Sequence, residues 1–241
     1  MESYKNLAEL SSEWVDIPEF HQYIHETFTK YMEDTPKLRE HRLWVKSNHF
    51  GFGEDSFGWL FKLIVDEMPK EFSFLEIGVF RGASLSLIKL LANISDRKVK
   101  RYGVSPMDNS DGHWDSDYFH DVYNIHYSFD LKPDYEIYHG SSTEERIIKK
   151  SLNTAPYDIL YIDGGHTKEV VDSDLLYYPQ MIKSGGYLMI DDCCNDMKMP
   201  WGFFQGIEPV TRAVLEWEKT DIGKEFEFVF NVVHLKVYKR K

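Results

Sequence analysis

Three aspartates and one histidine stand where two apolar runs of the sequence end. Asp163 follows the run DILYI, and Asp191 and Asp192 follow the run YLMI. Because charges are rarely left unpaired inside a core, an apolar run that stops at carboxylates indicates a buried strand ending at a water-facing rim. Three carboxylates without a basic partner would repel one another, and a hard cation such as Mg²⁺ removes that conflict. His166, close behind Asp163, is placed to exchange protons near neutral pH.

The segment FLEIGVFRGASLSL predicts a ligand-binding turn. It puts Glu76 at the end of a strand, Gly78 in the turn and Gly82 at the start of a helix. Doubly wound sheets bind cofactors at such turns, where glycine lets the backbone approach the ligand. The spacing E-x-G-x-x-x-G is not the dinucleotide motif G-x-G-x-x-G, and Glu76 would repel a pyrophosphate. A cationic ligand without phosphate, such as S-adenosylmethionine, fits better. The structural alternative is a packing turn in which Glu76 pairs with Arg81.

Strands and helices that alternate along the chain must position these residues. The predicted strands are 72–78, 99–105, 135–140, 157–163 and 185–192, and the predicted helices include 84–93, 143–152, 168–182 and 210–219. Short connections between alternating strands and helices imply parallel pairing. Residues 226–240 hold two alternating apolar runs with Asn231 near the turn, which predicts an antiparallel pair at the sheet edge. The fold class expected is α/β: a doubly wound, Rossmann-like, seven-stranded and mostly parallel sheet with an antiparallel C-terminal strand.

The first seventy residues differ in pattern from the rest. Amphipathic helices are predicted over 19–32 and 55–68, with a loop over 47–55. We expect residues 1–70 to form an N-terminal helical cap or lid on residues 71–241, the two making one compact unit. A length of 241 residues with 42% hydrophobic residues suits a single domain with a sizeable core.

Composition limits the classes of partner. With 40 acidic against 28 basic residues the net charge is -12, which disfavours a general attraction to nucleic acid or to anionic lipid. Cys193 and Cys194 are adjacent and cannot build a disulfide framework, and no signal peptide is evident, so a cytoplasmic setting is expected. No apolar run approaches the roughly twenty residues that cross a membrane. The aromatic N-terminal helices could supply a face for a homo-oligomer.

The segment DGGHTKEVVDSDLLYYPQMIKSGGYLMIDD closely resembles the metal-dependent O-methyltransferases of the macrocin type. Residues 72–192 as a whole resemble the class I methyltransferases that use S-adenosylmethionine. The family pattern is D-G-x-H, a helix, a P-G-G turn and a strand ending in D-D, and Ser184 replaces the proline here. The resemblance implies that Asp163, Asp191 and Asp192 bind Mg²⁺ or Mn²⁺, and that His166 is the general base. It also implies an acceptor hydroxyl on a sugar, within a nucleotide sugar, a glycan or a glycosylated natural product.

The remaining site residues are assigned to the cofactor and the acceptor. The cofactor contacts expected are Glu76, Gly78, Gly82, Ser84, Ser105, Asp108, Ser142 and Asp163. The second strand ends in Ser105, where an acidic residue commonly holds the ribose, so Ser105 or Asp108 is expected to take that part. Candidate acceptor contacts are His113 and Trp114 in the acidic loop after this strand, and His49 in the cap, since tryptophan suits stacking on a sugar ring. A solvated loop is the alternative for these three.

Other functions stay open at the level of sequence. A nicotinamide oxidoreductase is disfavoured by Glu76 and by the missing third glycine. A metal-dependent hydroxylase would need two histidines and one carboxylate, and only His166 accompanies the aspartates in the sequence. A non-catalytic module of the same fold is a third class. Instead of taking part in chemistry, His166 could cap the following helix or hydrogen-bond a rim carboxylate, and Asp192 could cap the next segment. Adjacent cysteines point in diverging directions, so Cys193 and Cys194 are left out of the site.

Overall fold

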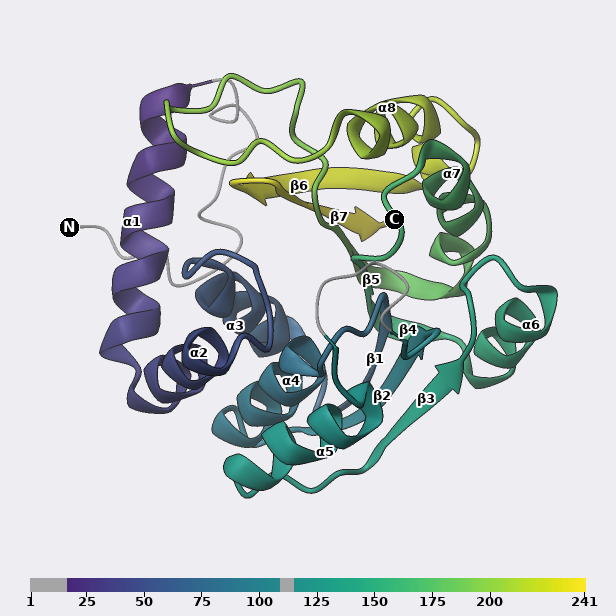
Figure 1. The fold of residues 1–241 in the computed structure, drawn as a ribbon. Coiled ribbons are helices and arrows are strands. Elements are labelled where there is room, and N and C mark those ends of the chain that lie inside the picture. The colour runs from purple at the N-terminus through teal and green to yellow at the C-terminus, as the bar shows by residue number, and fades with distance from the viewer. Residues whose placement is uncertain (1–16, 109–114) are drawn as a thin grey trace.

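The computed structural model describes residues 17–108 and 115–241. Its described residues form a seven-stranded sheet of order β3-β2-β1-β4-β5-β7-β6 (Figure 1). The strands are β1 (Glu71–Ile77), β2 (Lys98–Ser105), β3 (Tyr135–His139), β4 (Tyr157–Ile162), β5 (Ile182–Ile190), β6 (Phe226–Val232) and β7 (Leu235–Arg240). β1 to β5 pair in parallel, and β7 is antiparallel to both of its neighbours, β5 and β6. The predicted fold class is confirmed.

Helices cover both faces of the sheet, which explains why the central strands read as continuous apolar runs. All residues of β4 are buried, as parallel strands covered on both sides require. One face carries α4 (Ala83–Ile94) and α5 (Tyr118–Ser128), and the other carries α6 (Glu145–Thr154), α7 (Lys168–Tyr177) and α8 (Glu208–Trp217) (Figure 1). Parallel strands bring their carboxyl ends to one edge, so the predicted rims of β1, β4 and β5 lie side by side there.

The N-terminal helices pack on the α4 side of the sheet. They are α1 (Pro18–Asp34), α2 (Pro36–Asn48) and α3 (Phe57–Glu67) (Figure 1). The predicted helices at 19–32 and 55–68 correspond to α1 and α3, while α2 was not predicted. Ile24 and Phe28 of α1 and Leu60 of α3 join the same apolar cluster as Phe74 of β1 and Phe230 of β6. Helical cap and sheet therefore share one core, and the division at residue 70 stays a prediction.

Two boundaries differ from those expected. The helix predicted over 168–182 ends at Tyr177, because Pro179 cannot continue the hydrogen-bond ladder and starts the 3₁₀ turn η3 (Pro179–Met181). Asn231 lies within β6, and the turn of the C-terminal hairpin falls at residues 233–234 instead.

Within the described parts of the chain, no helix has both the length and the apolar character that crossing a membrane demands.

Candidate active site

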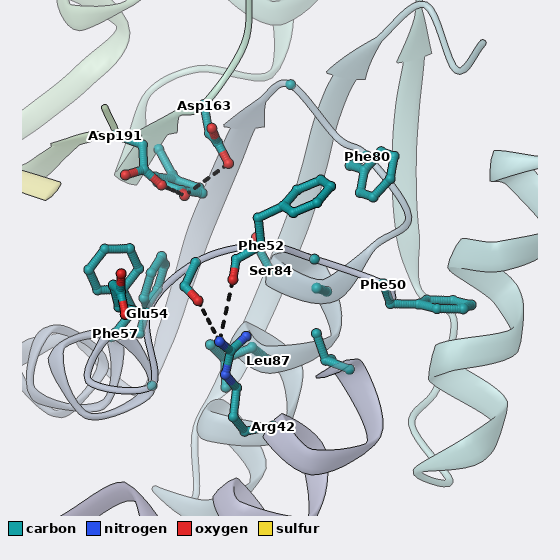
Figure 2. A pocket seen from close by; sticks show the side chains of 18 of the residues that line it. Arg42, Phe50, Phe52, Glu54, Phe57, Phe80, Ser84, Leu87, Asp163 and Asp191 are labelled. Atoms are coloured by element: carbon teal, nitrogen blue, oxygen red, sulfur yellow. Dashed lines mark hydrogen bonds between the residues drawn. The ribbon is translucent and has the colours of Figure 1, made fainter. Parts of the chain in front are cut away.

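A cavity of about 550 Å³ lies between the helical cap and the carboxyl ends of β1, β4 and β5. Figure 2 shows its aromatic and acidic sides, with Phe50, Phe52 and Phe57 opposite the rim of Asp163 and Asp191. The polar wall contains Glu76, Ser84, Tyr161, Asp163, His166, Asp191, Asp192 and His234, and the apolar wall contains Phe50, Phe52, Phe57, Phe61, Phe80 and Phe204. The cavity thus joins the predicted cofactor turn, the carboxylate rims and an aromatic chamber.

The turn after β1 is built for close backbone packing. Gly78 has a φ of 97°, a region that favours glycine, and a Cβ atom there would overlap the carbonyl oxygen of Asp163. The Gly78 N–H donates to the carbonyl of Val104 in β2 at 2.9 Å. Gly82 has a φ of 86° and is the N-cap residue of α4. Both predicted glycines therefore shape the turn.

Glu76 is buried at this turn without a cationic partner. Its side chain is 3% exposed, and among the described residues its Oε2 has no hydrogen-bond partner. Burial raises the pKa of Glu76 to about 8, and the neighbouring Ser84 hydroxyl opposes that shift only in part. The predicted alternative of a Glu76–Arg81 pair is wrong, because Arg81 Nε donates to Asp121 at 2.7 Å instead. A buried carboxyl with one unsatisfied oxygen and no cationic partner among the described residues is what a cationic ligand group would satisfy.

The structure brings Asp163 and Asp191 together at Tyr161, and Asp192 lines the same cavity. The Tyr161 hydroxyl lies 2.5 Å from Oδ2 of Asp191 and 3.1 Å from Oδ2 of Asp163. Burial, and then the charges of Asp191 and Asp192, raise the pKa of Asp163 well above its usual range. Asp192 has a φ of 58°, which is uncommon outside glycine and is typical of functional sites. The cluster thus holds more negative charge than its protein neighbours compensate.

His166 reaches the same cluster from the loop before α7. Its Nε2 lies 3.1 Å from Oδ2 of Asp192, and its side chain is 44% exposed. Asp163, His166 and Asp192 offer ligand atoms that all lie within 4.8 Å of one another. The helix-cap alternative for His166 is wrong, because Thr167 is the N-cap of α7 and its side chain accepts from the Val170 N–H. The other alternative, a contact with a rim carboxylate, is present in the structure as the contact with Asp192. The partly exposed ring also lines the cavity.

His234 is the site residue that the sequence interpretation missed. It lies in the turn between β6 and β7, with Nδ1 2.7 Å from Oδ1 of Asp191 and 3.3 Å from Oδ1 of Asp192. Burial alone would lower the pKa of His234, but the hydrogen bonds to Asp191 and Asp192 raise it to about 10. The sequence predicted the hairpin in which His234 lies, but not that β7 pairs with β5. This antiparallel pairing brings the hairpin turn to the edge of the sheet where β5 ends.

The other predicted residues lie away from the cavity walls. Ser105 and Asp108 are at the end of β2, where the Met107 N–H donates to Ser105 Oγ at 3.0 Å. Ser142 follows β3, is buried, and its carbonyl accepts from Tyr178 at 2.9 Å. These three remain candidates for the adenosine side of the turn.

His49 ends α2 in a left-handed conformation, is exposed and does not line the cavity, whereas its neighbour Phe50 does. The predicted His113 and Trp114 lie outside the described residues. Cys193 and Cys194 are buried and are absent from the cavity walls, in line with their omission from the site.

Residues 75–193, from β1 to the residue after Asp192, match the sequence model of a methyltransferase family, described as a methyltransferase domain. This match and the fold define the protein as a class I methyltransferase, the class that uses S-adenosylmethionine. The enzyme class expected from the sequence, a methyltransferase that uses S-adenosylmethionine, is therefore confirmed.

Known proteins of similar sequence or fold agree with this class. An uncharacterised protein of Acanthamoeba polyphaga mimivirus is 28% identical over 168 residues, which cover 67% of this chain and 71% of that protein. An O-methyltransferase from Bacillus cereus, solved with SAH (S-adenosylhomocysteine), has a TM-score of 0.59 at 11% identity and covers 90% of this chain and 100% of its own. MycE of the mycinamycin biosynthetic pathway, solved with Mg, SAH and mycinamycin VI, has a TM-score of 0.56 at 16% identity. That match covers 83% of this chain and 53% of MycE. The fold is shared with O-methyltransferases.

Proposed function

We propose that the protein transfers the methyl group of S-adenosylmethionine to a hydroxyl oxygen of a sugar-containing molecule, with Mg²⁺ or Mn²⁺ held by Asp163, Asp191 and Asp192. The observation that carries this proposal is the meeting of these carboxylates and His166 at one cavity, directly beside the glycine turn. MycE, which has the same fold, was solved with Mg and with SAH.

The donor set fits a hard divalent cation. Carboxylate oxygens are the ligands that Mg²⁺ prefers, and a site with several waters or substrate oxygens needs only a few of them. The raised pKa of Asp163 reflects burial and repulsion from Asp191 and Asp192, which a bound cation would relieve. A divalent cation at this place supplies positive charge that lowers the pKa of an acceptor hydroxyl and fixes its orientation.

The chain's own residues would perform the rest of the transfer. Methyl transfer is a direct displacement: the acceptor oxygen forms a bond to the methyl carbon while the carbon–sulfur bond breaks and its electron pair stays on sulfur. Glu76 would bind the cationic part of the cofactor, and the Gly78 turn would fix the direction of the methyl group. His166 Nε2 would take the hydroxyl proton and, being partly exposed, release it to solvent.

The cavity walls favour one kind of sugar acceptor. Besides the catalytic carboxylates, Glu54 lines the cavity, while Arg42 is engaged by Asp55 at 2.6 Å and by the carbonyls of Phe52 and Gly53. A diphosphate would meet net negative charge here, whereas the phenylalanine wall would bury an apolar body. We therefore favour a sugar attached to a neutral apolar group over a nucleotide sugar.

The test compares acceptors with and without metal. Purified protein, S-adenosylmethionine and Mg²⁺ are incubated with 4-nitrophenyl glycosides or with UDP-sugars, and methylated product is detected by mass spectrometry. The proposal expects product from a neutral glycoside that disappears with EDTA and returns with Mg²⁺ or Mn²⁺. Product formation that EDTA leaves unchanged would rule out the metal, and methylation of UDP-sugars alone would overturn the choice of acceptor.

A further inference from the structure

We propose that His234 is a positioning residue that fixes the carboxylates of Asp191 and Asp192 in the orientation that receives the divalent cation. This assignment rests on the proposed function, because it concerns the metal site of that reaction. His234 would act through the two aspartates and would not itself contact the methyl group or the acceptor oxygen.

Asp191 is held by donors on both of its oxygens. Oδ1 accepts from His234 Nδ1 at 2.7 Å and from the Asp192 backbone N–H at 2.9 Å, and Oδ2 accepts from the Tyr161 hydroxyl at 2.5 Å. Each carboxylate oxygen can accept more than one bond, so the remaining lone pairs of Asp191 stay available in a fixed direction. Removing the His234 donor would leave Oδ1 with the backbone N–H alone.

Asp192 is flanked by the two histidines of the site. His166 lies at its Oδ2, 3.1 Å away, and His234 lies at its Oδ1, 3.3 Å away. The histidine from the β4 loop and the histidine from the hairpin turn thus hold opposite oxygens of one carboxylate. Among the described residues, no group of possible metal ligands contains both histidines: His166 lies with Asp163 and Asp192, and His234 lies with Asp191 and Asp192. This arrangement disfavours the two-histidine, one-carboxylate site of a hydroxylase.

Two aromatic rings pack against the His234 imidazole, and a hydrogen bond holds its backbone. The Phe57 and Phe204 rings each lie 5.0 Å from the imidazole in edge contacts, and the His234 carbonyl accepts from the Cys193 N–H at 3.0 Å. The side chain is 7% exposed. A hydrogen-bond donor that is already immobilised loses little conformational entropy when it orients a metal-binding carboxylate. Residues that hydrogen-bond to metal ligands in this way raise the affinity of a site for its metal. Phe57 belongs to the helical cap, so the cap supports the metal site through His234.

Three substitutions separate a hydrogen-bonding role from a packing role. His234→Asn keeps an N–H donor near the place of Nδ1, His234→Gln moves the donor to the place of Nε2, and His234→Leu removes it. Mn²⁺ affinity is measured by electron paramagnetic resonance on protein saturated with SAH, and SAH affinity is measured by calorimetry. His120→Leu, at an exposed position on α5, is the control.

We expect His234→Gln and His234→Leu to weaken Mn²⁺ binding by about 10- to 100-fold, and His234→Asn to recover most of that loss. SAH affinity should change by no more than about threefold, since Glu76 and the glycine turn are untouched. Equal Mn²⁺ affinity in wild type and His234→Gln overturns the positioning role while leaving the proposed function standing. Equal losses in the Asn and Gln variants also overturn it. Absence of Mn²⁺ binding in the wild type would overturn both.

Discussion

The backbone of Gly78 lies directly against the backbone of Asp163, so closely that a Cβ atom on Gly78 would overlap the Asp163 carbonyl oxygen. The Asp163 N–H donates to the carbonyl of Ile77 at 2.8 Å, which ties the end of β4 to the end of β1. The cofactor turn and the first carboxylate are therefore held in one rigid backbone unit. The distance between the proposed methyl-donor site and the carboxylates would therefore be set by main-chain packing rather than by flexible side chains.

Gly78→Ala should disrupt this unit. The methyl group must displace the Asp163 backbone, so we expect SAH affinity to fall at least about tenfold and stability to fall by about 2 kcal/mol or more. Calorimetry and urea unfolding measure the two effects. Gly185→Ala is the matched control, since Gly185 also has positive φ but has no atom near its added Cβ. It should lose about 1 kcal/mol and keep its SAH affinity. Normal SAH binding by Gly78→Ala would contradict the assignment of the turn.

Glu76→Gln should weaken cofactor binding and remove its pH dependence. The pKa of Glu76 is raised to about 8, so the carboxyl of the free protein gains its negative charge as the pH rises through 8. The ammonium group of SAH prefers the charged form of Glu76, so the dissociation constant of SAH for the wild type should decrease between pH 6 and pH 8.5. Calorimetric titrations with SAH at these pH values test this. The Gln variant should bind SAH about tenfold more weakly than wild type at pH 8.5, and its SAH affinity should not depend on pH. If its affinity still changes with pH, the titrating group is not Glu76.

Asp163→Asn and Asp192→Asn should each lower methyl transfer at least about 100-fold at saturating cofactor. Each change replaces a carboxyl group of the cluster with a neutral amide of similar size. Mn²⁺ titrations should reveal weaker metal binding in parallel with the loss of rate, and excess metal should restore part of the activity. If the rate of methyl transfer falls while Mn²⁺ affinity is unchanged, the carboxylates assist proton transfer and do not bind a cation.

His166→Ala should lower kcat by about 10²- to 10⁴-fold, the range for loss of a general base. Because His166 also lies within ligand distance of Asp163 and Asp192, Mn²⁺ affinity distinguishes its two possible roles. Unchanged Mn²⁺ affinity with reduced kcat supports the base. A parallel drop in Mn²⁺ affinity would make His166 a metal ligand and require another base.

Asp174→Asn should stabilise the protein at neutral and alkaline pH. Asp174 in α7 is fully buried, and burial raises its pKa to about 7 from 3.8. The unfolded chain therefore releases this proton more readily, and stability is lost as pH rises from about 4 to 7. Removing the carboxyl should raise the unfolding free energy on the order of 2–4 kcal/mol at pH 8 and little at pH 4. Urea unfolding of this variant and of exposed Asp221→Asn tests the claim. An equal increase in the unfolding free energy at pH 4 and at pH 8 would mean that the effect comes from packing and not from the charge of Asp174.

Sequence reasoning placed the candidate site residues correctly where they stand next to the end of a strand. Asp163, Asp191 and Gly78 were placed because an apolar run stops abruptly, and parallel pairing then collects strand ends at one edge. It missed α2, whose PKLREHRLWVKSN pattern is polar nearly all round. It missed His234 because a hairpin residue meets the site only through the pairing of β7 with β5. It placed His49 in the acceptor site, but a left-handed turn leaves that side chain outside and brings Phe50 to the wall.

The apolar cluster shared by the helical cap and the sheet has a consequence for how an acceptor enters. Swinging the cap away would expose Phe28, Leu60 and Ile64, each fully buried, at roughly 1.5–3 kcal/mol per side chain. The cavity instead has a weakly covered margin at Phe52, which is 70% exposed and stacks on Phe80. A rotamer change of an exposed side chain takes picoseconds to nanoseconds, whereas a domain hinge motion takes microseconds to milliseconds. Acceptor capture should therefore be fast, and the slow step of turnover should lie in the chemistry or in product release.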